Sequence, residues 1–249
     1  MTWNTGTLYG LDTETTGVSI TDDRIITATI VKIVDGHLTD TREWLINPGI
    51  EIPPAATAVH GITTDHIRAN GVHPTDALPA IRDTTAAVLR ARYPLVVMNA
   101  AFDLSILEHE LTRWDQPTLR DLLTPDDWHT VIDPYVLAKG LEHTLRRQYV
   151  KGRTFKLPDL CKRYGVPFTE THDATADAVG ATLLAAALAD DEPDFATRAP
   201  AQLHTLQKTW RREQQKSLRD YFDKKGTEHD GVDGGWPLHT ALTRTEVPA

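Results

Sequence analysis

The sequence predicts an α/β domain that is built around a mixed β-sheet. Three strand-like runs come first in the chain and are separated by polar stretches. After residue 74, segments with helical periodicity alternate with short apolar runs that are typical of strands. Consecutive strands followed by a helix–strand–helix alternation indicate an α/β fold with a mixed sheet.

The first three strands are expected at residues 7–12, 24–34 and 41–47. The middle run is apolar and β-branched on both faces, which is typical of a strand inside a sheet that is covered on both sides. Asp35 and Gly36 form a turn dipeptide directly after it. We therefore expect these three strands to form an antiparallel meander.

The rest of the domain is expected to be mainly helical. Residues 94–98 and 129–133 predict two further short strands. Helical segments are predicted at residues 74–93 (in spite of Pro79), 100–114, 134–143, 157–165 and 173–190, the last of which is rich in alanine and leucine.

Composition places the chain among ordinary globular proteins. Of its 249 residues, 40% are hydrophobic and 24% are charged, and no apolar run approaches the ~18 residues that span a bilayer. The first residues lack a basic region followed by an apolar stretch, and the single cysteine, Cys161, fits a reducing compartment. We expect a cytoplasmic protein with no membrane partner.

The formal net charge is −9, with 26 lysines and arginines against 35 acidic residues. This balance argues against a protein that coats duplex DNA by neutralising many phosphates. An enzyme that holds a few nucleotides at a strand end is compatible with it, because bound metal ions can supply local positive charge.

Asp12 and Glu14 stand two residues apart at the end of the first strand, so their side chains point to the same face. Two adjacent carboxylates repel each other unless a cation lies between them. The pattern also matches the first half of an EF-hand loop that would close at Asp23. That alternative requires flanking helices and a closing glutamate, whereas this segment has strand-like flanks and an aspartate.

Three segments together resemble the motifs of a known enzyme family. They are LDTETTG (residues 11–17), NAAFDLSIL (99–107) and HDATADAVGAT (172–182), and their order and separations also match. On these motifs the chain resembles the DnaQ-like (DEDDh) 3′→5′ exonucleases, a family that includes the proofreading epsilon subunit of bacterial DNA polymerase III. The resemblance covers roughly residues 5–190.

The resemblance implies an RNase H-like fold with a five-stranded mixed sheet and a metal-dependent exonuclease activity. The implied catalytic residues are Asp12, Glu14, Asp103, His172 and Asp177. The four acids would bind two Mg²⁺ or Mn²⁺ ions, which prefer carboxylate oxygens. His172 would act as the general base from a loop that precedes the helix of Asp177, because the two side chains cannot share one helical face at a spacing of five residues.

The family also implies a set of residues that hold the terminal nucleotide, where an aromatic face can stack on the base. The implied set is Thr15, Gly17, His60, Asn99 and Phe102. Simple core packing is the alternative explanation for Phe102. The sequence departs from the family at residue 98, where methionine precedes the asparagine in place of the frequent histidine. This departure removes no metal ligand.

Composition changes after residues 190–195, an acidic, proline-containing connector. We expect a catalytic domain at residues 1–192 and a helical extension and tail at 193–249. Residues 199–225 carry seven lysines and arginines against three acids. They predict either a basic helix that approaches nucleic acid or a solvated helix that packs its apolar residues on the domain, and charge runs favour the latter. The latter would bury Leu203, Leu206, Trp210 and Leu218.

The expected partner is the 3′ end of a single-stranded nucleic acid, with DNA favoured over RNA. A DNA polymerase or a sliding clamp is a further candidate, since QKSLRDYF (residues 215–222) matches the pattern of peptides that bind sliding clamps. This match lies inside a predicted helix, whereas such peptides are normally exposed. Two alternatives stay open from sequence: an exonuclease that trims RNA 3′ ends, as RNase T and oligoribonuclease do, and a non-catalytic module that binds a polymerase or a nucleic acid end.

Overall fold

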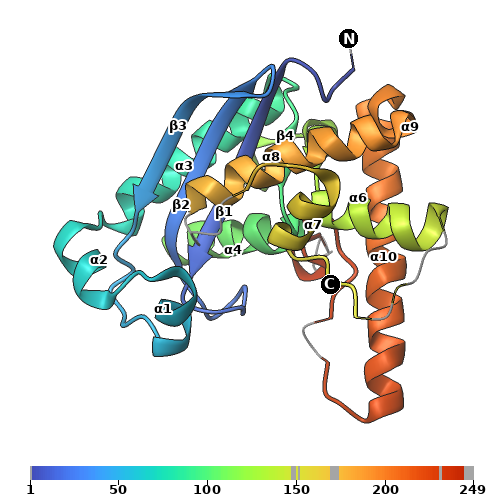
Figure 1. Ribbon diagram of the computed structural model, residues 1–249. Coiled ribbons are helices and arrows are strands. Elements are labelled where there is room, and N and C mark those ends of the chain that lie inside the picture. Colours follow the sequence, from blue (N-terminus) through green and yellow to red (C-terminus); the bar gives the residue numbers. More distant parts are fainter. Residues whose placement is uncertain (1, 147–149, 151, 169–173, 230–231, 244–249) are drawn as a thin grey trace, which may run out of the picture.

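The computed structural model of the protein describes residues 2–146, 150, 152–168, 174–229 and 232–243. A five-stranded sheet with the order β3-β2-β1-β4-β5 forms its centre (Figure 1). The strands are β1 (Thr7–Thr15), β2 (Ile25–Val34), β3 (His37–Leu45), β4 (Leu95–Val97) and β5 (Val131–Ile132). The central strand is therefore β1, which lies near the N-terminus of the chain and contains most of the first sequence motif.

The sheet is mixed, as the sequence predicts. Strand β2 pairs antiparallel with both β1 and β3, whereas β4 lies parallel to β1 and β5 lies parallel to β4. The predicted meander is thus confirmed, although β3 begins at His37 rather than at residue 41. Asp35 and Gly36 both have positive φ angles, 50° and 80°, so the turn is tight and pairing resumes directly after it.

The helices of the first half include two that were not predicted from the sequence. These are α1 (Pro54–His60) and α2 (Thr64–Asn70), which follow β3. Each has seven residues, which is too short to display a clear helical period. Ala56 and Ile67 bury their side chains with Ile26 and Ile52 in a small separate cluster, so tertiary contacts rather than local pattern fix these helices.

The other helices of seven or more residues agree closely with the prediction, whereas the shorter helical elements at residues 119–122, 125–130, 193–197 and 240–243 were not predicted. The helical elements that follow α2 are α3 (Pro74–Arg90), α4 (Ala100–Arg113), α5 (Leu119–Leu122), the 3₁₀ turn η1 (Pro125–Thr130), α6 (Pro134–Gly140), the π-helical turn η2 (Leu141–Leu145), α7 (Leu157–Tyr164), α8 (Ala174–Asp191), α9 (Pro193–Thr197), α10 (Pro200–Lys225) and α11 (Thr240–Thr243). Helix α3 contains Pro79, as expected. The connector at residues 190–195 is more helical than predicted, because α8 and α9 occupy most of it.

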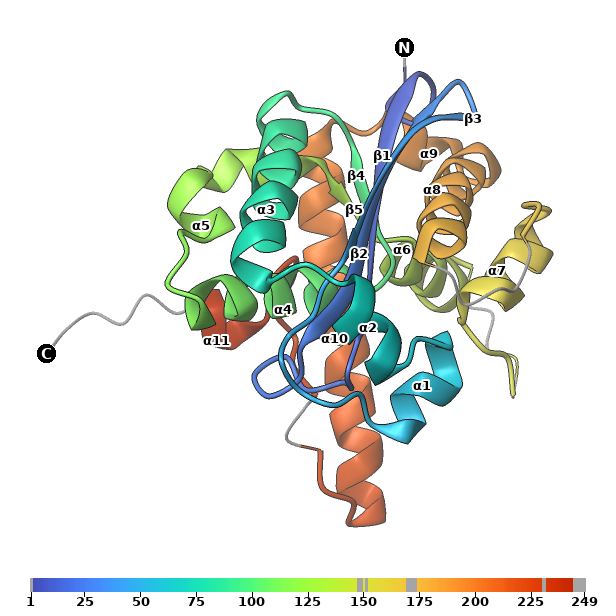
Figure 2. The ribbon, with the colours of Figure 1, turned by 90° about the vertical axis from the view of Figure 1, so that its left-hand side faces the viewer.

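The helices cover both faces of the sheet. Viewed along its edge, α3, α4 and α5 lie on one side and α7 and α8 on the other (Figure 2). Helix α8 packs directly on β1 and β2. In the part of the chain that the structure describes, no helix combines the length and the apolar character needed to cross a membrane.

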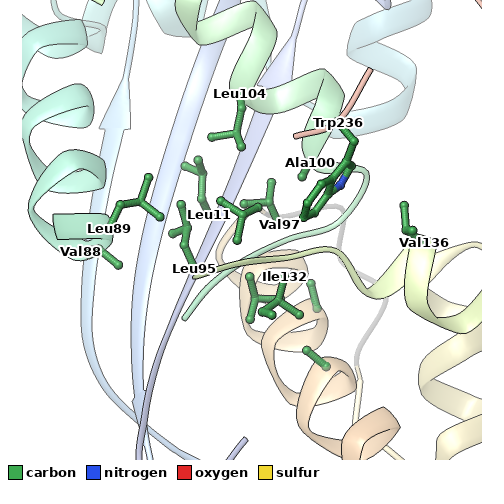
Figure 3. Close-up of a cluster of buried hydrophobic side chains, with 14 of the residues drawn as sticks. Leu11, Val88, Leu89, Leu95, Val97, Ala100, Leu104, Ile132, Val136 and Trp236 are labelled. Carbon is green, nitrogen blue, oxygen red and sulfur yellow. The ribbon is translucent and has the colours of Figure 1, made fainter. Parts of the chain in front are cut away.

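The C-terminal extension shares the main hydrophobic core. Phe195, Leu203 and Trp210 are almost fully buried in the same cluster as Leu11 of β1, and Leu206 packs against its edge. Trp236 inserts beside Ala100 and Val97 (Figure 3). This arrangement agrees with the expectation that the long polar helix packs on the domain through Leu203, Leu206 and Trp210, whereas Leu218 is only partly buried and lies outside this cluster. The domain division at residue 192 stays a prediction, and the C-terminal half of α10 extends past the sheet (Figure 1).

Candidate active site

The C-terminal end of β1 carries the first two predicted acids, Asp12 and Glu14. They alternate along the strand, so their side chains share one face of the sheet. Helix α8 lies over this face and presents Asp177 in its first turn. One carboxylate oxygen from each of the three residues lies within 4.8 Å of the others, and all three side chains are partly buried. Asp177 thus joins two acids that precede it by 165 and 163 positions in one acidic cluster.

A glycine in β1 allows α8 to approach the sheet closely. A Cβ atom on Gly10 would collide with Thr182 Oγ1 and would lie 2.7 Å from the carbonyl oxygen of Ala178, both on α8. The Thr182 hydroxyl in turn donates a hydrogen bond to this carbonyl at 2.7 Å. Only a residue without a side chain fits here, and the resulting helix–strand contact is what carries Asp177 to the end of β1.

The acidic cluster fits a divalent cation. Three carboxylates at this separation repel one another in a medium of reduced dielectric, and a bound cation removes that cost. Mg²⁺ and Mn²⁺ prefer such oxygen donors over nitrogen or sulfur. Cys161 is the only thiol of the chain, and it is buried, with its pKa raised to about 11 by burial first and by Asp177 second.

Asp103 lies beside this cluster but outside the group of three. It sits in the first turn of α4, where its Oδ1 accepts hydrogen bonds from the backbone N–H of Thr13 at 3.1 Å and from the Thr13 hydroxyl at 2.7 Å. Thr13 is the residue between Asp12 and Glu14. Burial raises the pKa of the Asp103 carboxyl to about 7, and the hydrogen bonds from Thr13 oppose this shift.

The remaining predicted catalytic residue, His172, falls outside the residues that the structure describes, as does Asp173. The description resumes at Ala174, where α8 begins. The role of His172 as a general base stays a prediction.

Thr15 at the end of β1 and Gly17 in the loop after it are the first predicted contacts to a nucleotide. The Thr15 hydroxyl donates to the carbonyl oxygen of Gly17 at 2.6 Å. A Cβ atom on Gly17 would lie 2.5 Å from the carboxylate of Asp23. That carboxylate accepts from the Thr16 hydroxyl at 2.7 Å and from the N–H of Ser19 at 2.8 Å. Gly17 therefore also has a structural role, in letting Asp23 close the loop.

The same loop excludes the EF-hand alternative. Strands β1 and β2 flank it, where an EF-hand needs two helices. Asp23, the residue that would close a calcium loop, instead bonds to Thr16 and Ser19 within the turn.

His60 ends α1 and lies close to the loop after β1. It is 8% exposed, and its Nδ1 accepts a hydrogen bond from the N–H of Ile62 at 3.1 Å, so the ring proton belongs on Nε2. Burial lowers the pKa of His60, while the nearby backbone of Thr15 acts in the opposite direction. The predicted place of His60 near a terminal nucleotide stays a prediction.

Asn99 and Phe102 both take part in structural contacts. Asn99 precedes α4 with a left-handed backbone (φ 62°), and its side-chain oxygen accepts a hydrogen bond from Nη1 of Arg211 at 3.1 Å. Phe102 is partly buried and packs against the main core. Their predicted contacts to a nucleotide stay predictions.

The comparisons with known proteins agree with this site. The sequence pattern of the exonuclease family that is named after RNase T matches residues 10–184. The chain belongs to this exonuclease family. The match spans all three motifs, and the expected membership of the DnaQ-like 3′→5′ exonucleases is confirmed, together with the enzyme class.

Similar proteins include bacterial DNA polymerase III proteins. DNA polymerase III subunit epsilon is 29% identical in Rickettsia prowazekii and 30% identical in Rickettsia typhi, in each case over 175 residues that cover 68% of this exonuclease and 67% of the relative. A PolC-type DNA polymerase III from Listeria innocua is 27% identical over 238 residues, which are 95% of this chain and 14% of that polymerase.

Among solved structures, exonuclease I has the same fold. One structure of exonuclease I superposes with a TM-score of 0.63 at 19% identity and covers 76% of this chain. The E. coli enzyme in complex with a dT13 oligonucleotide gives 0.62 at 19% identity, again over 76% of this chain. This chain spans 42% of exonuclease I. The likeness confirms the predicted RNase H-like fold.

The structure also brings residues to the site that the sequence analysis missed. Asp133 is fully buried and accepts hydrogen bonds from the N–H groups of Asn99 at 3.1 Å and Ala100 at 3.0 Å, at the start of α4. It also caps α6 through the N–H of Tyr135 at 3.0 Å. An aspartate before a proline at a helix start is a capping signal, but its bonds to α4 span more than 30 residues and leave no local trace.

Proposed function

We propose that the protein hydrolyses phosphodiester bonds at the 3′ ends of single-stranded or frayed DNA and releases nucleoside 5′-monophosphates. The convergence of Asp12, Glu14 and Asp177 within 4.8 Å supports this proposal most strongly. Three carboxylates from two elements, on a chain of the exonuclease family, fit a site that works with divalent cations.

The proposed cofactors are two Mg²⁺ or Mn²⁺ ions. When bound, such ions activate the attacking water and stabilise the charge on the leaving oxygen. Asp12, Glu14 and Asp177 would hold them, with Asp12 shared by both. Asp103, which Thr13 anchors beside the cluster, would serve the second ion, directly or through water.

His172 is the proposed general base. An imidazole titrates near neutral pH and can therefore accept the proton of the attacking water. Thr15, Gly17, His60, Asn99 and Phe102 would surround the terminal nucleotide. A hydrogen bond from the Thr15 hydroxyl to the carbonyl oxygen of Gly17 and the nearness of His60 to the backbone of Thr15 support placing these three residues around one nucleotide.

DNA is the favoured substrate, and a DNA polymerase is a candidate partner. Relatives at 29–30% identity are DNA polymerase III epsilon subunits, and a structural relative binds a dT13 oligonucleotide. Proofreading or trimming of DNA ends would follow from these relatives. The segment at residues 215–222 that matches clamp-binding peptides lies within α10, and Gln215 is buried. Only the sequence match therefore supports a sliding clamp as a partner. A cytoplasmic location stays a prediction.

The test is a degradation assay with 5′-labelled single-stranded DNA and RNA oligonucleotides of the same sequence. We expect a ladder of shortened products on DNA in Mg²⁺ or Mn²⁺ and no products in the presence of a chelator. Faster degradation of the RNA would contradict the proposed substrate and identify an RNA 3′-end exonuclease. Absence of a metal-dependent ladder on both substrates would leave the non-catalytic binding module as the alternative.

A further inference from the structure

The start of α4 is held by contacts from the C-terminal extension. Asp133 lies between the N-termini of α4 and α6, where one carboxylate accepts hydrogen bonds from backbone N–H groups of both helices. Each helix start has N–H groups without partners inside the helix, and a buried anion satisfies several of them at once. The orientation of α4 relative to α6 therefore depends on Asp133.

Three residues of the extension complete this network. The side chain of Gln207 accepts from the N–H of Asp133 at 2.7 Å and donates to the carbonyl oxygen of Val131 at 3.1 Å. Trp236 Nε1 donates to Asp133 Oδ2 at 3.3 Å. Burial raises the pKa of Asp133, and the guanidinium of Arg211 opposes this effect.

Arg211 also bonds directly to the residue that begins α4. Its Nη1 donates to Oδ1 of Asn99 at 3.1 Å. Asn99 has a left-handed backbone, a conformation that non-glycine residues adopt only at a cost, so its neighbours must maintain it. Four residues later, Asp103 reaches Thr13 between the two acids of β1.

We propose that Arg211 is a positioning residue of the exonuclease site. It acts through Asn99, fixes the first turn of α4 and so sets the place of Asp103 beside the acidic cluster. The C-terminal extension is then part of the catalytic architecture and not only a cover for the core. This inference rests on the proposed roles of Asp103 and Asn99.

The first test is steady-state hydrolysis of a 5′-labelled single-stranded DNA by the full-length Arg211→Met variant in Mg²⁺. We expect kcat to fall about tenfold while KM changes less than about twofold, as for residues that do not bind a metal themselves but fix the orientation of a side chain that does. Arg211→Lys keeps a donor and a charge and should recover part of the loss. Arg212→Met removes a guanidinium from the exposed face of the same helix and should match the wild type.

A double-variant cycle separates positioning from a general loss of structure. Asn99→Gly removes the acceptor amide and keeps a backbone that tolerates positive φ. If Arg211 acts through Asn99, adding Arg211→Met to Asn99→Gly should cost less than about twofold in kcat, because coupled residues are not additive. A full tenfold loss in both backgrounds, or a wild-type kcat for Arg211→Met, would overturn the inference.

Amide hydrogen exchange supplies a readout that does not depend on activity. In Arg211→Met the N–H groups of residues 99–104 should exchange faster than in Arg212→Met, while those of β2 remain protected. Unchanged exchange at residues 99–104 would contradict the positioning role. An inactive wild-type protein would instead refute the proposed function, and the exchange result would still decide whether Arg211 holds α4.

Discussion

Helix α4 carries acids of two kinds, and their surroundings differ. At its last turns, Glu108 and Glu110 are fully buried and paired with arginines. Glu108 accepts from the N–H of Leu119 at 2.7 Å and from Arg120 Nε at 2.6 Å, and Glu110 accepts from Arg24 Nε at 2.7 Å. These carboxylates join α4 to its neighbours.

At the first turn of the same helix, Asp103 points to the end of β1. Its hydrogen bonds come from Thr13, a neutral residue, and the carboxylates of Asp12, Glu14 and Asp177 converge nearby. Buried acids that stabilise a fold are matched by cations of the protein, whereas an enzyme can keep a group of acids together for a cation that arrives with the substrate. This difference separates the structural end of α4 from its proposed catalytic end.

The largest effect is expected for Asp12→Ala. Removal of the carboxylate that both ions would share should lower exonuclease activity by more than about 10⁴-fold, as for central catalytic residues. The melting temperature should not fall, because the change removes one of three repelling charges. Product ladders and thermal unfolding measure the two quantities.

The matched control for Asp12→Ala is Asp40→Ala, which removes an exposed acid from β3 of the same sheet. It should keep wild-type activity. If Asp12→Ala retained a tenth of the wild-type rate, the distinction between catalytic and structural acids would fail at its central residue.

His172→Ala comes second in the size of its effect. Loss of a general base typically costs 10²–10⁴-fold, and bound ions would still activate the attacking water, so we expect residual activity about 10²–10³-fold below wild type. Single-turnover hydrolysis with enzyme in excess measures this rate. Equal residual rates in His172→Ala and Asp12→Ala would contradict the proposed division of roles.

Gly10→Ala should affect both stability and catalysis. The new methyl group collides with Thr182 and Ala178 and moves α8, which carries Asp177, away from β1. We expect a loss of about 1–3 kcal/mol in the free energy of unfolding and about a tenfold fall in kcat of the folded enzyme. Urea unfolding and steady-state kinetics measure the two effects.

Gly234→Ala is the control for the glycine prediction, since its added Cβ atom would have its nearest contact at 3.6 Å. It should change neither quantity. A Gly10→Ala enzyme with wild-type stability and kcat would show that α8 does not need this close approach to place Asp177.

Glu108→Ala should have the smallest effect on catalysis and a clear effect on stability. It leaves the buried N–H of Leu119 without its acceptor and Arg120 without its partner. We expect a loss of about 2–3 kcal/mol in the free energy of unfolding and an unchanged kcat per folded molecule. A large fall in kcat of the fully folded variant would contradict this prediction, because it would show that Glu108 also contributes to catalysis.

Much of the fold could be predicted from the sequence, because its signals are local. Strand β2 at residues 25–34 is an apolar run in the sequence, and the turn at Asp35 and Gly36 fixes its pairing with β3. The apolar residues of α10 predict its packing on the domain. The short helices α1 and α2 were missed, since a seven-residue helix that is stabilised by contacts with β2 leaves too little pattern.

The residues of the site also fall into those that the sequence predicts and those that only the structure reveals. The motifs locate Asp12, Glu14 and Asp177, and the structure brings these three together. Asp133 and Arg211 could not be found, because their roles arise from hydrogen bonds to Asn99 across 34 and 112 residues. A buried polar network of this kind has no periodicity and depends on how the C-terminal extension folds back on α4.

The most direct test of the central claim is a crystal structure with Mn²⁺ and a nucleoside 5′-monophosphate, examined for anomalous scattering at the manganese edge. We predict anomalous peaks among the carboxylates of Asp12, Glu14 and Asp177, with the phosphate bound to the same ions and a second peak towards Asp103. Crystals with the nucleotide or the cation elsewhere, and no anomalous peak among these three acids, would contradict the assignment of this cluster as the catalytic centre.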